Sequence, residues 1–320
     1  MENNEAIAGT IANIGNTCCI NTFIQCIAHI PSLNSYIVNK VTKSSELFNQ
    51  LQDVLKIIWT DKNNVCHPHR LVHVIYQTFP DILTPGHQHD ISEILTLILD
   101  KISIEIGRPY AYDVHKTNDI LNKINECMYH YNDGKTSKLI KNIQNTQLSI
   151  LNCNNTECDF QQINVEVYTT LMLDINDLTD FNNIISNYFK KELVHDWTCD
   201  KCKTKNNADK YMKLWNLPYV LIIVLKRFKY SDDGRFHKIN NYIDIPENIT
   251  FGKGSILKHQ DLDYSYNLKA IGNHIGSYGG GHYYAFCKTN DGWYAYDDNN
   301  STKLNKLNFD NAYVLFYERV

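Results

Sequence analysis

The first third of the chain carries its hydrophobic residues at helical spacing. One such segment covers residues 18–29 and is closed by Pro31. A second begins at about Ser44, and a third follows the Pro-Gly turn at residues 85–86. We therefore predict three helices, followed by an Asn-rich and Lys-rich stretch to about Ser149 that contains one helix and loops.

Further along the chain the pattern changes to β-branched and aromatic runs that are bounded by turn residues. The predicted strands cover residues 165–175, 219–228, 266–271, 282–288, 293–296 and 312–317. Helices first and strands later predict an α+β protein, in which a helical lobe packs against a mostly antiparallel β lobe with a cleft between them. No internal repeat divides the sequence.

Composition and charge narrow the class of protein. The chain has 320 residues, of which 43% are hydrophobic and 21% charged, as in an ordinary folded globular protein. The 31 Lys and Arg residues and 35 Asp and Glu residues give a net charge of −4, which argues against a nucleic-acid binder. No signal peptide or membrane-spanning stretch is evident, so we expect a reducing intracellular compartment, the cytoplasm or nucleus, of a host cell if the source is viral.

The segment before the first helix points to a reactive cysteine. Asn16 and Thr17 are good helix-capping residues, so Cys18 is predicted in the first helical turn, where backbone N–H groups and the helix dipole lower a thiol pKa. The Cys18 N–H and the nearby Asn13 amide could both donate to an oxyanion. The alternatives are that Cys18 is a small buried hydrophobic residue and Asn13 a plain turn residue.

A histidine and an aspartate are predicted on one hairpin. The strand that starts at His282 and the strand that ends at Asp297 are joined by a tight turn. With a two- or four-residue loop, odd positions of one strand pair with even positions of the other, so both side chains share a face. A carboxylate that orients an imidazole is what a cysteine nucleophile requires. The alternative is a surface histidine with ordinary partners.

Four motifs, in order from Thr10 to Arg319, resemble those of the ubiquitin-specific protease family. TIANIGNTCCINTFIQ is similar to its cysteine box, and NHIGSYGGGHYYAF with GWYAYDDNN and NAYVLFYER to its histidine box. GHQHDISEILTLILD resembles the family's Gln-Asp-Glu helix, and LPYVLIIVLKRF its central strand. The resemblance implies one papain-like cysteine protease domain over residues 1–320, shaped like a hand, with a thumb at about 9–145, fingers at about 146–218 and a palm at about 219–320 that shares strands with the fingers.

The same resemblance implies catalytic roles for five residues. Cys18 matches the nucleophile, His282 the general base and then acid, and Asp297 the third member of the triad that orients it. Asn13 matches the asparagine of the oxyanion hole. Asp298 matches a second acidic position that assists or partly replaces the third member.

Three residues of the Gln-Asp-Glu helix match positions that contact the ubiquitin tail. They are Gln88, Asp90 and Glu93. Two carboxylates three residues apart share a helix face and suit a basic tail. Taken without the resemblance, Asp90 and Glu93 would more often be plain first-turn helix acids. Cys19 departs from the family by standing where an aromatic residue is usual.

Four cysteines form two pairs with the spacing of zinc knuckles. Cys153 and Cys158 make the first pair, and Cys199 and Cys202 the second, tighter one. The family often carries two such pairs at its fingertips, so a structural zinc ion is expected. The alternatives are a finger that has lost its metal and a redox pair.

The expected function is a deubiquitinating cysteine protease, which hydrolyses the peptide or isopeptide bond after ubiquitin's C-terminal glycine through an acyl-enzyme. Its expected partners are ubiquitin and ubiquitin-conjugated proteins, with no nucleic acid or membrane, and we expect a monomer. The alternatives are a catalytically silent ubiquitin-binding module, a protease for another ubiquitin-like modifier, and a zinc-ribbon nucleic-acid binder, which the charge disfavours.

Overall fold

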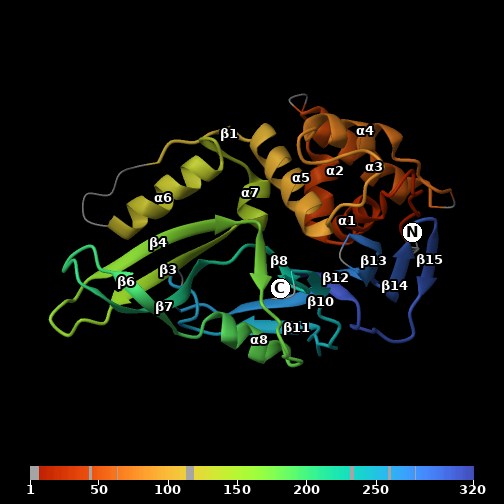
Figure 1. The fold of residues 1–320 in the computed structure, drawn as a ribbon. Coiled ribbons are helices and arrows are strands. Elements are labelled where there is room, and N and C mark those ends of the chain that lie inside the picture. Colours follow the sequence, from red (N-terminus) through yellow and green to blue (C-terminus); the bar gives the residue numbers. More distant parts are fainter. Residues whose placement is uncertain are drawn as a thin grey trace.

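The structure is a computed structural model that describes residues 7–42, 45–62, 64–112, 119–230, 234–258, 261–277 and 279–320. Helices gather at one end of the molecule and a four-stranded sheet extends at the other, with a larger sheet joining them (Figure 1). We call the helical part the thumb, the larger sheet the palm and the four-stranded sheet the fingers. No helix among the described residues is long and apolar enough to cross a membrane.

Five helices form the body of the thumb. They are α1 (Cys18–Ala28), α2 (Pro31–Asn39), α3 (Glu46–Thr60), α4 (His69–Thr78) and α5 (Ile91–Glu105). The three predicted helices correspond to α1, α3 and α5. The predicted start of α3 at Ser44 lies outside the described residues, and Ser45 caps the helix by accepting a hydrogen bond from the Phe48 N–H. Pro31 closes α1 but also begins α2, because a proline at the first helical position loses no hydrogen bond.

The stretch between thumb and fingers contains more structure than predicted. It holds α6 (Asp119–Tyr131), α7 (Lys138–Ile143), β1 (Arg108–Pro109) and β2 (Lys135–Thr136). The prediction of one helix plus loops up to Ser149 is therefore wrong, since β3 (Asn145–Cys153) already begins inside it. In α6 the residues Ile120, Ile124 and Met128 keep helical spacing, and Ile124 is buried in a cluster with residues of the fingers.

The palm is an eight-stranded sheet whose strands come mainly from the second half of the chain. In order they are β15 (Asn300–Lys303), β14 (Gly292–Asp297), β13 (Gly280–Thr289), β12 (Tyr264–Ser277), β16 (Ala312–Arg319), β8 (Val220–Leu225) and β5 (Thr170–Leu173), with β11 (Asn248–Phe251) beside β12. All pairs are antiparallel except β5 with β8. The prediction of a mostly antiparallel sheet is confirmed.

The fingers are a separate four-stranded sheet. Their order is β4 (Gln161–Tyr168), β3, β7 (Lys205–Asn216) and β6 (Glu192–Thr198), and α6 covers one face of them (Figure 1). The single strand predicted at residues 165–175 is divided between β4 of the fingers and β5 of the palm. A short helix, α8 (Phe181–Tyr188), and a hairpin of β9 (Phe228–Tyr230) and β10 (Phe236–Lys238) were not predicted as such.

The palm sheet is buried on both faces, which positions the thumb. Ile222 and Val224 of β8 face the core that contains α1, whereas Leu221 and Ile223 face the core that contains α8. Alternation of this kind follows from the two-residue period of a strand. With the sheet covered on both faces, α1 is fixed against β13, and this contact builds the candidate site.

Candidate active site

Cys18 is the first residue of α1, as predicted. The N-cap residue Thr17 makes no side-chain capping bond. Instead the Asn13 side-chain oxygen accepts hydrogen bonds from the backbone N–H groups of Gly15 (3.2 Å) and Thr17 (3.1 Å), and so shapes the turn that leads into the helix. The turn before the helix thus fixes where the thiol lies.

Burial controls the ionisation of this thiol. Cys18 is 3% exposed, and burial raises the pKa of its thiol above the ordinary value, with a further rise from the Asp298 carboxylate. Backbone N–H groups, including that of Tyr283, act in the opposite direction but are outweighed. The predicted lowering of the Cys18 pKa by the helix start is therefore wrong for this conformation, because desolvation exceeds the effect of the donors.

His282 and Asp297 meet at the open end of the hairpin. Strands β13 and β14 pair with Ala285 opposite Tyr296, and a two-residue loop joins them, so the predicted shared face is confirmed. The imidazole Nε2 lies 2.5 Å from an Asp297 carboxylate oxygen. The Asp297 carboxylate therefore holds the ring in one orientation.

The Cys18 thiol and the His282 imidazole do not form a hydrogen bond with each other among the described residues. The imidazole ring is engaged with Asp297. The Cys18 sulfur instead lies near the backbone N–H of Tyr283, the residue that follows His282. The structure thus brings the predicted base and its orienting acid together, and places the Cys18 thiol beside the same strand without a hydrogen bond to the imidazole.

Asp298 ties the two ends of the chain together at the site. Its carboxylate accepts hydrogen bonds from the side-chain amides of Asn13 (2.9 Å) and Asn21 (2.8 Å), and its backbone oxygen accepts from the Ile11 N–H. The sequence reasoning missed Asn21. A polar residue three positions after Cys18, and therefore on the same face of the predicted helix, was the available signal.

Asp90 is fully engaged within the protein. It is the N-cap of α5, and one oxygen accepts from the Ser92 N–H at 2.7 Å. The other oxygen accepts from the hydroxyl groups of Tyr313 (2.7 Å) and Tyr283 (3.3 Å). The carboxylate therefore joins α5 to two palm strands, as the helix-acid alternative anticipated, and has little capacity left for a ligand.

Gln88 and Glu93 line a cavity of about 270 Å³ between α5 and the palm. Its wall includes Phe228, His274 and the glycines that precede His282. Glu93 is exposed, and no described residue forms a hydrogen bond or ion pair with it, so its charge is available to a ligand. Gln88 instead bonds to the backbone of Gly281 across the cavity.

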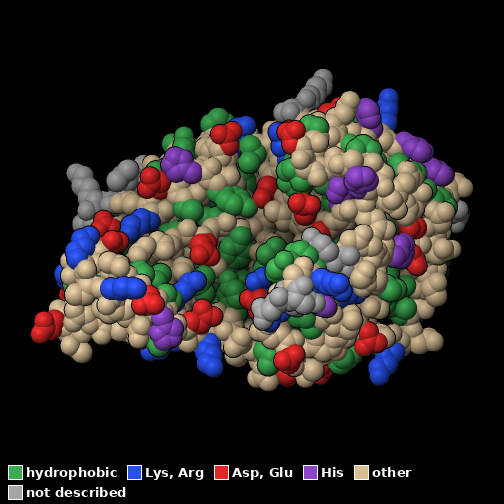
Figure 2. Space-filling model, in the orientation of Figure 1, with side chains coloured by type: hydrophobic (Ala, Val, Ile, Leu, Met, Phe, Trp, Pro, Cys, Tyr) green, Lys and Arg blue, Asp and Glu red, His purple; other side chains and the backbone are tan. Residues whose placement is uncertain are grey.

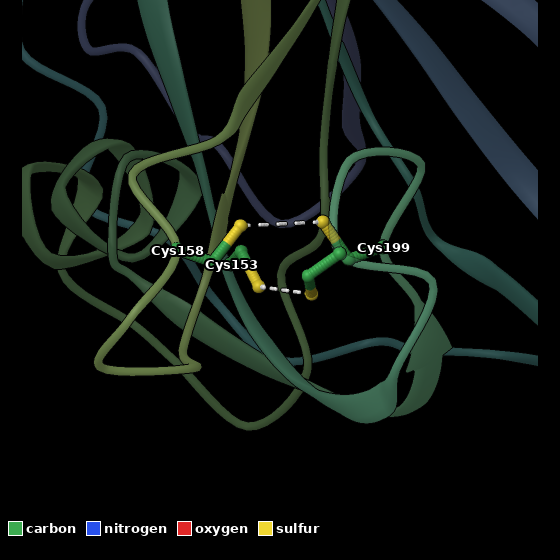
Figure 3. Close-up of side chains that lie close together, drawn as sticks. Cys153, Cys158 and Cys199 are labelled. Carbon is green, nitrogen blue, oxygen red and sulfur yellow. Dashed lines mark hydrogen bonds between the residues drawn. The ribbon is translucent and has the colours of Figure 1, made fainter.

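The four predicted cysteine ligands converge at the tip of the fingers, where their sulfurs face one another (Figure 3). The sulfurs of Cys153 and Cys202 are 3.9 Å apart and those of Cys158 and Cys199 are 3.7 Å apart. A tetrahedral zinc ion with Zn–S bonds of ~2.3 Å places its ligand sulfurs ~3.8 Å apart. The cluster therefore has the size that such an ion requires.

Neighbouring groups favour the thiolate form of part of this cluster. Hydrogen bonds from the side chain and backbone of Thr204 lower the pKa of the Cys202 thiol to about 6. The Asn206 amide donates to the Cys153 sulfur at 3.3 Å and is the largest cause that lowers its pKa. Donors directed at sulfur are typical second-sphere groups of a metal site, because zinc binds the thiolate.

The surface between fingers and thumb is apolar at its centre. Hydrophobic side chains gather in the middle of this face, between the part covered by α6 and the thumb helices, while Lys, Arg, Asp and Glu side chains are interspersed around them (Figure 2). An apolar centre with a mixed polar rim is typical of a protein-binding surface.

Solved structures share this fold. Ubp8 in the SAGA deubiquitinating module bound to ubiquitin aldehyde has a TM-score of 0.76 and 22% identity over all of this chain and 71% of that chain. A variant of the same module bound to monoubiquitin gives 0.75 and 20%, over all of this chain and 70% of that one. The fold is thus the α+β, hand-like fold of ubiquitin-specific proteases. In those structures Ubp8 is assembled with Sgf11, Sus1 and Sgf73, so the predicted monomeric state finds no support in them.

A family model described as ubiquitin carboxyl-terminal hydrolase matches residues 10–317. The chain therefore belongs to the ubiquitin carboxyl-terminal hydrolase family. It is 27% identical to Usp2 of Drosophila melanogaster over 99% of this chain, 25% to hydrolase 8 of Saccharomyces cerevisiae over 99%, and 24% to human hydrolase 21 over 96%. The chain spans 35%, 71% and 61% of the lengths of these three relatives.

Proposed function

We propose that the protein is a deubiquitinase that hydrolyses the bond after the C-terminal glycine of ubiquitin, with Cys18 as nucleophile. The observation that carries this proposal is the arrangement at one end of β13: a thiol at a helix start, beside the strand that holds the bonded pair of His282 and Asp297. Membership in a family named for ubiquitin hydrolysis supplies the substrate.

The proposed reaction has two steps that use the same groups. The Cys18 sulfur, after its proton passes to His282, attacks the glycine carbonyl carbon, and Asn13 with the Cys18 N–H donates to the oxyanion. The C–N bond breaks, the leaving amine takes the proton from His282, and a thioester remains. Water then attacks the thioester, His282 accepts its proton, and the C–S bond breaks to release the carboxylate and the thiol.

The resting geometry requires a rearrangement before this reaction. His282 has to come within hydrogen-bond distance of the Cys18 sulfur, since the two are not bonded in the structure. An imidazolium beside the sulfur would favour the thiolate and so offset the burial that raises the thiol pKa. We propose that substrate binding supplies this change.

Recognition of a basic tail is proposed to rest on Glu93. Its carboxylate has no partner among the described residues and lines the cavity between α5 and the palm, whereas the Asp90 carboxylate already accepts hydrogen bonds from Ser92 and two tyrosines. An arginine side chain can form a bidentate pair with such a carboxylate.

A catalytically silent ubiquitin-binding module is the second candidate. The observations in its favour are the missing bond between Cys18 and His282 and the raised Cys18 pKa. A protease for another ubiquitin-like modifier would use the same site, and substrate tests separate it from both.

The fingertip cysteines are proposed to hold one structural zinc ion. The sulfur spacings and the donors from Thr204 and Asn206 support this assignment. The ion would join the β3–β4 turn to the β6–β7 turn, and its chemistry would be structural only, because four thiolates leave no open position.

The proposal is tested with a ubiquitin probe that carries a C-terminal electrophile. The protein forms a covalent adduct, Cys18→Ala does not, and Cys19→Ala, which removes the neighbouring thiol, still does. Turnover of a fluorogenic ubiquitin substrate separates the enzyme from the silent module, which binds ubiquitin without releasing product. Probes made from other ubiquitin-like proteins identify the modifier. An adduct that survives Cys18→Ala overturns the assignment.

A further inference from the structure

Two hydrogen bonds join Gln88 to Gly281 across the cavity between α5 and β13. The Gln88 side-chain Nε2 donates to the Gly281 carbonyl at 2.9 Å, and the Gly281 N–H donates to Gln88 Oε1 at 2.8 Å. Two residues of paired antiparallel strands exchange the same two bonds. The Gln88 carboxamide therefore occupies, at Gly281, the hydrogen-bonding positions of a strand partner.

Among the described residues, no strand pairs with the edge of β13 that Gln88 occupies at this point. Strand β12 lies on one side, with Gly276 opposite Gly281, whereas β14 pairs with β13 only from Ala285 to Thr289. An open strand edge with unpaired peptide groups is a template for an extended peptide. Gln88 covers the part of this edge that lies at the cavity.

The cavity is shaped so that a backbone, and not a side chain, lies at this position. A Cβ atom on Gly281 would clash with His274 Nε2 and with the Ile275 carbonyl. His274 is 3% exposed, lines the same cavity and has an Nδ1 atom with no hydrogen-bond partner among the described residues. Gly281 therefore presents only its peptide groups to whatever enters.

We infer that Gln88 is a latch residue, which stands in for a substrate peptide group at Gly281 and is released when ubiquitin's extended C-terminal segment pairs with that edge. The inference rests on the proposed function, which supplies the peptide. A closed latch reduces the fraction of protein that is competent to bind, and the apparent affinity falls by the same fraction. Gln88 is exposed and touches no reacting atom, so its effect is on binding.

The test compares KM and kcat for a fluorogenic ubiquitin substrate. Gln88→Ala lowers KM about fivefold, as loss of two exposed hydrogen bonds that favour the closed form would do. Gln88→Glu gives a fall in the same direction, because a carboxylate cannot donate to the Gly281 carbonyl and is repelled by it. Gln77→Ala, an exposed glutamine of α4, leaves KM unchanged.

Three results would overturn the latch. A higher KM for Gln88→Ala would make Gln88 a substrate contact, an unchanged KM would make the bonds irrelevant, and a fall in kcat alone would make Gln88 a positioning residue. Hydrogen exchange at the Gly281 amide provides a test that needs no turnover: it is faster in Gln88→Ala than in the wild type, and an equal rate also overturns the latch. Absence of any Cys18 adduct with the ubiquitin probe signals failure of the proposed function instead.

Discussion

The side-chain amide of Asn13 donates to the carboxylate of Asp298 at 2.9 Å, so that the turn before Cys18 is held by a residue 285 positions away. The same carboxylate lies close enough to Cys18 to raise its pKa, after burial. Asp298 thus acts on the candidate site in two ways: it orients the proposed oxyanion donor, and it disfavours the thiolate.

The variant Asp298→Asn distinguishes the effect of Asp298 on the Cys18 pKa from its effect on the orientation of Asn13. Removing the charge lowers the Cys18 pKa, so the rate of Cys18 alkylation by iodoacetamide rises at a fixed pH near 7. Turnover of a ubiquitin substrate falls, by roughly tenfold or more, because Asn13 loses its charged acceptor. The measurements are the pH profile of alkylation and kcat.

Asn299→Ala, beside Asp298 in the same turn, is the matched control and changes neither quantity. Slower alkylation of Cys18 in Asp298→Asn would show that the carboxylate does not oppose ionisation of the thiol.

Zinc removal is expected to expose a reactive thiol at the fingertip. In metal-free protein the Cys202 pKa of about 6 leaves this partly exposed cysteine largely ionised at pH 7, whereas burial keeps the Cys18 thiol protonated. Iodoacetamide therefore modifies Cys202 before Cys18 after chelation, and zinc protects Cys202. Peptide mass spectrometry gives the order, and elemental analysis gives one zinc per chain before chelation.

Cys199→Ser loses the bound zinc, and Cys127→Ser, a cysteine outside the cluster, keeps it. The zinc assignment is wrong if the purified wild type binds no zinc or if Cys199→Ser binds as much as the wild type.

Arg227 is expected to be the costliest charged residue of the palm to replace. It is 0% exposed, and its guanidinium donates to the carbonyl groups of Ala312 (2.6 Å), Ile239 (2.9 Å) and Asn241 (3.1 Å). Lysine cannot reach these diverging acceptors with one ammonium group, so Arg227→Lys lowers the free energy of unfolding by about 3 kcal/mol. Urea denaturation measures the loss.

Lys226→Ala is the control for this substitution. Lys226 is the neighbouring residue, forms an exposed ion pair with Asp174, and costs less than about 1 kcal/mol when replaced. Equal losses for the two variants would show that the buried guanidinium contributes no more than a surface charge.

The sequence predicted correctly those elements whose hydrophobic residues are spaced regularly along the chain and are also the residues buried in the structure. The helix at Cys18 and the hairpin that joins His282 to Asp297 have strong periodicity and turn signals, so both were predicted with nearly correct bounds. Helix α4 was not predicted, although its buried residues Leu71, Val72 and Ile75 keep helical spacing, and the stretch that contains α6 was predicted to hold one helix without its bounds. Strands β4 and β5 adjoin in sequence but pair in different sheets, and only tertiary contacts decide such a division.

The candidate site shows the same limit. Residue types and spacing brought out Cys18, His282 and the four fingertip cysteines, because their chemistry is evident from neighbours in sequence. Residue types and spacing could not show that burial raises the Cys18 pKa. Nor could they show that the Asp90 carboxylate accepts hydrogen bonds from two tyrosines on distant strands. Desolvation and long-range hydrogen bonds depend on packing, which no local pattern encodes.

The last prediction concerns His29, at the opposite end of α1 from Cys18. Its Nδ1 lies 2.8 Å from the Gln25 carbonyl, which can only accept, so Nδ1 carries the proton. Its Nε2, 3.1 Å from the Tyr296 hydroxyl, then accepts from that group. Burial lowers the His29 pKa to about 4, because a second proton would charge a dry site and remove the acceptor for Tyr296.

The sign of the resulting pH dependence follows from the two pKa values. In the unfolded chain His29 has a pKa of about 6.5 and becomes protonated as the pH falls below that value. In the folded protein His29 becomes protonated only near pH 4. The stabilisation from neutral His29 is therefore complete above about pH 6.5 and is lost as the pH falls toward 4, by up to about 3 kcal/mol. His29→Phe keeps the ring packing against Trp59 and Tyr296 but does not titrate. It is less stable than the wild type at pH 7.5, and the difference narrows at pH 5, as measured by urea denaturation.

The exposed His73→Gln serves as the control and leaves the pH dependence of stability as in the wild type. A difference between His29→Phe and the wild type that stays constant or widens on acidification would show that His29 is not held neutral. Because Tyr296 directly precedes Asp297, and α1 begins at Cys18, protonation of His29 breaks a contact between the two elements that carry the candidate catalytic groups. Acid should therefore loosen the site before it unfolds the fingers, because the hydrogen-bond and ring partners of His29 among the described residues lie in the thumb and in β14.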